Sequence, residues 1–145
     1  MKDLDWSNLS FGYRQTDYNV RCYYRNGKWG EIEVCSDEYL KLHMAATCLH
    51  YGQEAFEGLK AYRCPDGKVR VFRMDENAAR LQSTCRGIMM PEVPTEMFEE
   101  MVKKVVRLNQ EWIPTYESGA TLYIRPLLIG TSAQVGVHPA TEYCF

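Results

Sequence analysis

Tyr123 and Arg125 are the two residues of this sequence whose types and spacing best suit the binding of a small anion. They lie in or directly after a β-prone stretch, residues 120–124. Because side chains alternate along a strand, we expect both to point to the same face, roughly 6 to 7 Å apart. A phenol and a guanidinium at that distance can converge on one anionic ligand. The commoner use of such a pair is an outward strand face with a cross-strand salt bridge.

A second candidate is the segment from Leu49 to Tyr62, which sets two aromatic rings and two glycines just before a predicted hairpin. The rings of Tyr51 and Phe56 could form one wall of a pocket, although core aromatics are at least as common. The glycines are expected to permit backbone bends, since no glycine-rich phosphate loop follows a strand here.

Two β-hairpins are predicted from turn chemistry. Asn26-Gly27 can supply the positive φ angles of a tight turn, and in Pro65-Asp66-Gly67 the proline fixes φ while the glycine takes the left-handed position. The flanking strands are Arg21 to Tyr24 with Trp29 to Val34, and Leu59 to Arg63 with Val69 to Arg73.

A helix is predicted over about 76–88, with Asp75 as its N-cap. Arg80 lies off its apolar stripe, where a solvated surface charge is the ordinary interpretation. The stripe has the spacing of one buried helix face and consists of Ala78, Leu81, Cys85 and Ile88.

A second helix is predicted over about 96–112, capped by Thr95 and ended by Pro114. Glu99 with Lys103 and Glu100 with Lys104 form i, i+4 pairs on its exposed side. Its apolar stripe is Phe98, Met101, Val102, Val105, Leu108 and Trp112.

Hairpins and two main helices predict an α+β fold, with a mostly antiparallel sheet and the helices packed on it; an α/β label would also be compatible. The 145 residues fit one domain, and 46% hydrophobic with 25% charged residues is ordinary for a globular chain.

Composition also argues against several partners. A net charge of −2 provides no basic stripe for nucleic acid. The six cysteines lack zinc-site spacing, so no metal is predicted. Neither a signal peptide nor a membrane-spanning run is recognised, so we expect free thiols, a cytoplasmic location and no membrane partner.

Several motifs occur together in a familiar order: Tyr51-Gly-Gln-Glu-Ala-Phe56-Glu57-Gly58, then Phe72-Arg73 with Arg80, then Leu122-Tyr123-Ile124-Arg125-Pro126 and Gly130. From about Phe11 onward the chain resembles the small N-terminal domain of the branched-chain amino acid aminotransferases, which are fold type IV pyridoxal-phosphate enzymes. It implies that residues 1–145 form that single domain.

The resemblance implies specific roles at matching positions. Arg80 would contact the phosphate of pyridoxal 5'-phosphate, which suits a guanidinium. Phe11, Tyr51 and Phe56 would line the pocket for the branched aliphatic side chain of the substrate.

The remaining matches concern the substrate and a second subunit. Tyr123 and Arg125 would serve the substrate site, the arginine being suited to the second carboxylate of glutamate or 2-oxoglutarate. Val135 and Val137 would reach into the neighbouring subunit's site in a homodimer. Without the family context, these valines would simply anchor a loop.

The resemblance further implies that the catalytic lysine lies in a large C-terminal domain beyond Phe145. No lysine of this chain occupies a matching motif, and we expect residues 1–145 alone to be inactive. The lysines are Lys2, Lys28, Lys41, Lys60, Lys68, Lys103 and Lys104.

Branched-chain amino acids and 2-oxo acids are thus the expected substrates of the parent enzyme. The nearest alternatives are a D-amino acid aminotransferase and an aminodeoxychorismate lyase. A non-catalytic, stand-alone binding or assembly domain is the alternative from a different functional class.

Overall fold

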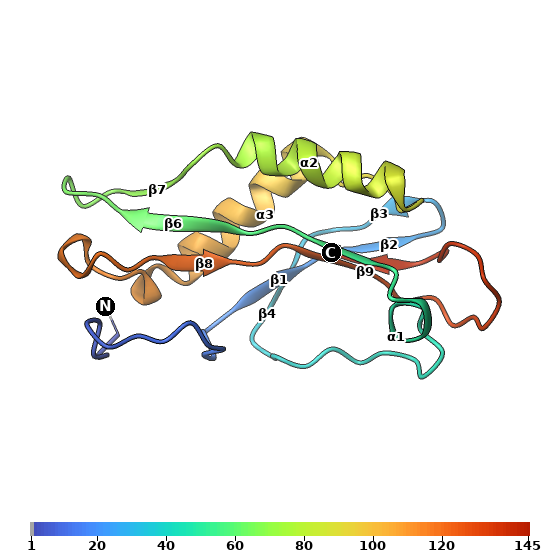
Figure 1. The fold of residues 1–145 in the computed structure, drawn as a ribbon, viewed down its shortest axis with the longest axis horizontal. Coiled ribbons are helices and arrows are strands. Elements are labelled where there is room, and N and C mark those ends of the chain that lie inside the picture. Colours follow the sequence, from blue (N-terminus) through green and yellow to red (C-terminus); the bar gives the residue numbers. More distant parts are fainter. Residues whose placement is uncertain (1) are drawn as a thin grey trace.

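The computed structural model describes residues 2–145 (Figure 1). Its helices are α1 (Thr47–Tyr51), α2 (Met74–Gly87) and α3 (Thr95–Leu108), followed by the short 3-10 helices η1 (Gln110–Trp112) and η2 (Tyr116–Ser118). Its strands are β1 (Asn19–Arg21), β2 (Tyr23–Arg25), β3 (Lys28–Trp29), β4 (Glu33–Cys35), β5 (Glu54–Phe56), β6 (Leu59–Arg63), β7 (Val69–Val71), β8 (Leu122–Ile124), β9 (Leu127–Gly130) and β10 (Tyr143–Cys144). Every strand pairing among these residues is antiparallel, so the predicted α+β class is confirmed.

One long antiparallel ladder joins β5 and β6 to β9 and β8. β5 pairs with β9 and β6 pairs with β8 in the same register, so the two stretches form a single bent ribbon. At the bend the Glu57 N–H still donates to the Pro126 carbonyl at 2.9 Å. Pro126 has no N–H with which to return that bond. The ribbon connects the sheet β3-β2-β10-β9-β5 to the sheet β7-β6-β8.

Residues 19–25 form a second long strand, made of β1 and β2 in line. β2 turns into β3 through Asn26 and Gly27, whose φ angles of 52° and 75° confirm the predicted tight turn. Beyond β3 the pairing slips by one residue before β4 meets β1, which is the signature of a β-bulge. The single strand predicted over 29–34 is therefore wrong: it is divided into β3 and β4.

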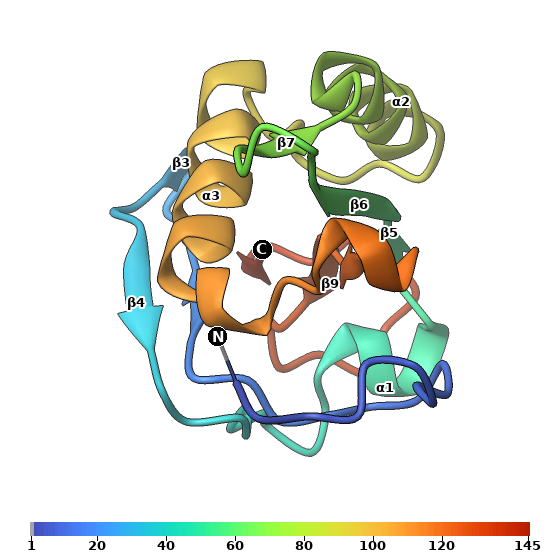
Figure 2. The same cartoon turned by 90° about the vertical axis from the view of Figure 1, so that its left-hand side faces the viewer.

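β10 lies between β2 and β9 and carries the last residues of the chain into the middle of the molecule (Figures 1 and 2). Phe145 and Cys22 exchange both backbone hydrogen bonds, at 2.9 and 2.8 Å, which extends the β10 pairing past β2.

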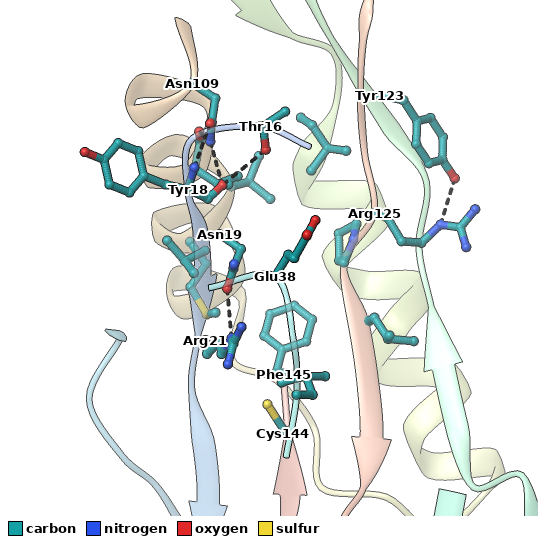
Figure 3. Close-up of a pocket in the computed structure, with 18 of the residues that line it drawn as sticks. Thr16, Tyr18, Asn19, Arg21, Glu38, Asn109, Tyr123, Arg125, Cys144 and Phe145 are labelled. Atoms are coloured by element: carbon teal, nitrogen blue, oxygen red, sulfur yellow. Dashed lines mark hydrogen bonds between the residues drawn. The ribbon is translucent and has the colours of Figure 1, made fainter. Parts of the chain in front are cut away.

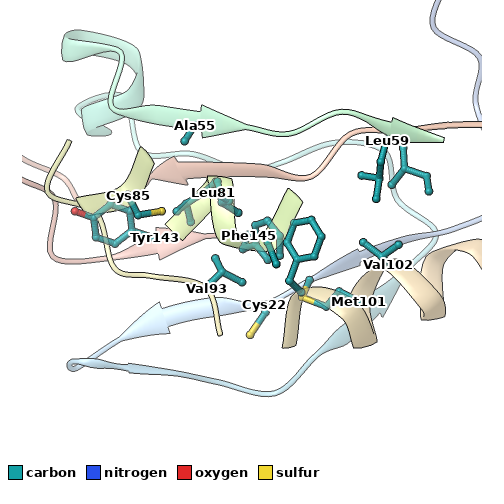
Figure 4. Close-up of a cluster of buried hydrophobic side chains, with 14 of the residues drawn as sticks. Cys22, Ala55, Leu59, Leu81, Cys85, Val93, Met101, Val102, Tyr143 and Phe145 are labelled. Atoms are coloured by element: carbon teal, nitrogen blue, oxygen red, sulfur yellow. The ribbon is translucent and has the colours of Figure 1, made fainter. Parts of the chain in front are cut away.

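Helices α2 and α3 lie side by side against the sheets, and α1 lies apart from both of them (Figure 2). α3 presents its apolar stripe inward, where the fully buried ring of Phe98 stacks on Phe145 with centroids 6.0 Å apart. Figure 4 shows the shared core, in which side chains from α2 and α3 meet residues of the strands. Its labelled members are Cys22, Ala55, Leu59, Leu81, Cys85, Val93, Met101, Val102, Tyr143 and Phe145.

Both predicted helices exist, but their ends differ from the prediction. α2 begins at Met74 because Arg73 takes the left-handed conformation before it, so Asp75 lies in the first turn and is not the cap. At its other end Ile88 follows the helix and is exposed, in contrast to Ala78, Leu81 and Cys85.

α3 ends at Leu108, and Trp112 lies in η1. Thr95 is the first helical residue and makes no capping bond; instead its hydroxyl accepts a hydrogen bond from Gln82 at 3.2 Å. The two i, i+4 ion pairs are confirmed, with N···O distances of 2.7 and 3.6 Å.

We expect Phe98→Ala to lower the free energy of unfolding by about 3–5 kcal/mol, because it removes a fully buried ring and leaves a cavity against Phe145. Phe72→Ala is the matched control, since the Phe72 ring is 80% exposed, and it should change stability by about 0.5 kcal/mol or less. Urea denaturation measures both. Equal effects of the two substitutions would contradict the packing described for α3.

Candidate functional site

The candidate site is built around a buried carboxylate, Glu57, at the bend of the long ribbon. Its side chain is 3% exposed and accepts hydrogen bonds from Arg80 Nε at 2.8 Å and Arg80 Nη2 at 2.7 Å. Asn77, one turn before Arg80 on α2, donates to the same carboxylate at 2.8 Å. The bidentate ion pair between Glu57 and Arg80 thus links the ribbon to α2.

Two opposing effects act on the pKa of Glu57. Burial would raise it, whereas the hydrogen bonds from Arg80 and Asn77 and the charge of the guanidinium lower it, and the net result lies below the usual value for glutamate. Glu57 is therefore ionised at neutral pH. Its charge fixes the orientation of the Arg80 side chain.

Arg80 is well suited to hold an anion in this orientation. The side chain is 68% exposed, and Glu57 occupies only the Nε edge of the guanidinium. A guanidinium carries five N–H donors, so the Nη1 donors and the second Nη2 donor face outward. This arrangement fits the phosphate of pyridoxal phosphate, as the sequence resemblance implies for Arg80.

Four of the predicted residues form a cluster of rings around one guanidinium. Arg125 lies over the Phe56 ring at 4.3 Å. Its Nε also donates to the Tyr123 hydroxyl at 3.0 Å (Figure 3). The ring of Phe11 meets Tyr123 edge to face, with centroids 5.2 Å apart. The prediction that Tyr123 and Arg125 point to the same face is confirmed. The remaining donors of Arg125 are available to a carboxylate beside an apolar wall.

Gly58 makes this cluster possible. A Cβ atom at position 58 would lie 2.6 Å from the Tyr123 hydroxyl, closer than any real contact allows. Position 58 therefore requires glycine for the close approach of Tyr123, not for an unusual φ angle. Asn77 also donates to the Gly58 carbonyl at 3.4 Å, which joins the cluster to the Glu57 ion pair.

Tyr51 and Val135 form a second group, beside the end of the ribbon. The Tyr51 hydroxyl, at the end of α1, donates to the Val135 carbonyl, which ties α1 to the loop 131–139. The side chains of Val135 and Val137 are exposed, as are those of Phe11 and Phe56. The expected pocket residues thus present their apolar surface outward, where another part of a larger protein could cover it.

Glu57 binds Arg80 directly and Asn77 supports Glu57, although the sequence alone predicts neither role. The sequence does indicate that Asn77 and Arg80 lie near each other, because residues three apart share a helix face. Their common partner could not be found from the sequence, since Glu57 lies in a different element, on the ribbon.

No metal-ligand cluster of histidine, cysteine, aspartate or glutamate is found among residues 2–145. None of the helices in this described range is long and apolar enough to cross a membrane. All six cysteines are free thiols.

Comparison with known proteins identifies close relatives in sequence. The chain is 51% identical over 145 residues to the branched-chain-amino-acid aminotransferase of Haemophilus influenzae, covering 100% of this chain and 42% of the relative. It is 46% identical over 145 residues to the enzyme of the same name from Helicobacter pylori, covering 100% of this chain and 43% of that relative. No protein-family model matches the chain.

Solved structures of branched-chain aminotransferases have a similar fold over most of this chain. The branched-chain aminotransferase of Thermoproteus uzoniensis superposes with a TM-score of 0.64 at 21% identity, over 88% of this chain and 39% of that one. The branched-chain amino acid aminotransferase of Escherichia coli gives a TM-score of 0.59 at 24% identity, over 88% of this chain and 38% of that one.

The chain thus has the fold of the matched part of these branched-chain aminotransferase structures. More particularly, its resemblance to the N-terminal part of branched-chain aminotransferases is confirmed. The chain spans about two fifths of the length of the relatives it matches.

We expect Glu57→Gln to lower the free energy of unfolding at pH 7 by about 1–3 kcal/mol, because a charged hydrogen-bonded partner of Arg80 is lost. The folded-state pKa of Glu57 is lowered, so its contribution is present above the unfolded pKa and disappears as the pH falls through the folded pKa. The stability difference from the wild type should therefore shrink as the pH falls below about 4.5, the ordinary glutamate value, and vanish below the folded-state pKa. Urea titrations across this range measure it.

Glu54→Gln makes the same chemical change on β5, where the side chain is exposed, and serves as the control. A Glu57→Gln difference that stays constant with pH would mean that the charge of Glu57 does not stabilise the fold.

Proposed function

We propose that this chain is the N-terminal, pocket-forming part of a branched-chain amino acid aminotransferase. The observation that carries the proposal is 51% identity along all 145 residues to an enzyme of that name. The parent enzyme would exchange the amino group of leucine, isoleucine or valine with 2-oxoglutarate.

Arg80 would bind the phosphate of pyridoxal 5'-phosphate through its outward donors, while Glu57 holds the guanidinium from behind. The bound cofactor supplies an electron sink for the carbon that exchanges its amino group. A catalytic lysine would hold the cofactor covalently and transfer a proton during the exchange of the amino group. We assign this lysine to a large C-terminal domain that follows this small one. Asn77 is a positioning residue, because it acts through Glu57.

The substrate would lie along the rings. Phe11, Tyr51 and Phe56 would exclude water around a branched aliphatic side chain. Arg125, oriented by Tyr123, would take the second carboxylate when glutamate or 2-oxoglutarate is bound. Val135 and Val137, exposed on their loop, would complete the site of a second subunit in a homodimer. We place the enzyme in the cytoplasm.

The full-length protein should transaminate L-leucine with 2-oxoglutarate and should not turn over D-alanine or aminodeoxychorismate. In the same assay residues 1–145 alone should show no turnover, because none of their lysines occupies a matching motif. Turnover of D-alanine only would show that the protein is a D-amino acid aminotransferase and would refute this proposal. Activity of the 145-residue chain would refute the assignment of the catalytic lysine to a C-terminal domain.

In the full-length enzyme Arg80→Lys should weaken pyridoxal phosphate binding roughly tenfold or more, because a single ammonium replaces a fork that binds Glu57 and phosphate together. Arg86→Lys is the matched control on α2, where Arg86 pairs with Glu92 at 2.8 Å. Fluorescence titration with the cofactor measures both. Equal affinity of the two variants for pyridoxal phosphate would show that Arg80 does not bind the cofactor.

A further inference from the structure

A groove of about 390 Å³ opens between the two long strands of the molecule, directly beyond the end of β10. One wall is β1, with Asn19, Val20 and Arg21; the opposite wall runs from Leu122 to Leu127. Figure 3 shows Cys144 and Phe145 at one end of the groove, between the strand that carries Arg21 and the chain that carries Arg125. The gap therefore continues the line of β10.

Both walls direct backbone hydrogen-bonding groups into this gap. Backbone groups alternate in direction along a strand, and Cys22 bonds to Phe145, so the N–H and C=O of Val20 face the same side as those of Cys22. On the other wall the Thr131 N–H bonds to the Glu142 carbonyl, so Leu127, four residues earlier, also faces the β10 side. Within the described residues β1 pairs only with β4, and β10 pairs with β9 only as far as Ile129.

The floor of the groove is apolar. Met101, Val102 and Val105 of α3 line it, together with Ile124. Phe145 already packs onto the same helix through Phe98. Because side chains alternate across a strand, every second residue of a segment that continued from Phe145 would face this floor.

We propose that the groove is the binding site of one further β-strand, formed by the residues that follow position 145 in a protein of the relatives' length. The relatives are more than twice as long as this chain. This strand would pair with β1 on one side and with the 122–127 stretch on the other, and it would join the three sheets into one. The proposal concerns assembly of the fold and stands apart from the proposed activity.

The existing pairing fixes the register of this strand. Continued by one residue, it places the first residue after Phe145 opposite Leu127, with a hydrogen-bonded pair between them. The second residue then lies opposite Val20 and bonds with it, and its side chain faces Val102 and Val105. The second and fourth positions of the segment should therefore be apolar.

The test compares three forms of the protein by amide hydrogen exchange. They are residues 1–145, the same chain extended by Thr-Val-Thr-Val-Thr, and the same chain extended by Val-Thr-Val-Thr-Val. The two extensions have closely matched β-propensity and differ in which side chains face α3. The amide of Glu57, already bonded to Pro126, is the internal reference that removes any change in global stability.

With the first extension, exchange at Val20 and Leu127 should slow roughly tenfold or more relative to Glu57, and with the second it should slow clearly less. Unchanged exchange with the first extension, or equal protection by both, would overturn the proposal. Slow exchange at Val20 and Leu127 that is already present in the 145-residue chain and grows with protein concentration would also overturn the proposal. It would mean that a second copy of the chain binds in the groove.

Discussion

The long ribbon made of residues 54–63 and 122–130 is the constraint on which the candidate site depends. Its register places Phe56 opposite Leu127 and continues unchanged to Leu59 opposite Ile124. A slip of one residue would turn every side chain of one stretch to the other face. The stacking of Arg125 on Phe56 and the burial of Glu57 would then be lost together. The ring cluster and the orientation of Arg80 by Glu57 are therefore consequences of one strand pairing.

The second group of the site, around Tyr51, is held to the same ribbon by close packing and by one amide side chain. Gly130 on β9 lies so near α1 that a Cβ atom there would be 2.2 Å from the Thr47 hydroxyl. Gln53 accepts the Gly130 N–H at its backbone carbonyl and the Ala140 N–H at its side chain, at 3.0 and 2.8 Å. α1 and the loop 131–139 are thus fixed relative to the sheet, although each is short.

The parts of the fold that could be predicted from the sequence are those that depend on local chemistry. The turns at Asn26-Gly27 and at Gly67 take the positive φ angles that their residue types favour, and α3 follows its apolar period. Not predicted were α1, β5 and β9, which have three to five residues each. Segments that short repeat the helix or strand period too few times for the pattern to be recognised. β5 exists because it pairs with residues far away in the chain. The same distinction holds for the site. Strand alternation alone predicts that Tyr123 and Arg125 share a face. The role of Glu57 depends on the contact between the ribbon and α2, which the sequence does not reveal.

The pairing of Glu57 with Arg80 has a consequence for how an anion would be recognised. The buried carboxylate neutralises the guanidinium at short range, so the net charge available to attract a distant anion is small. What remains is a set of fixed N–H donors in a plane, whose orientation costs no further side-chain entropy when the ligand binds. Recognition at Arg80 would then depend on the geometry of a phosphate or similar oxyanion more than on its charge. A lysine at this position would keep the charge and lose that geometry.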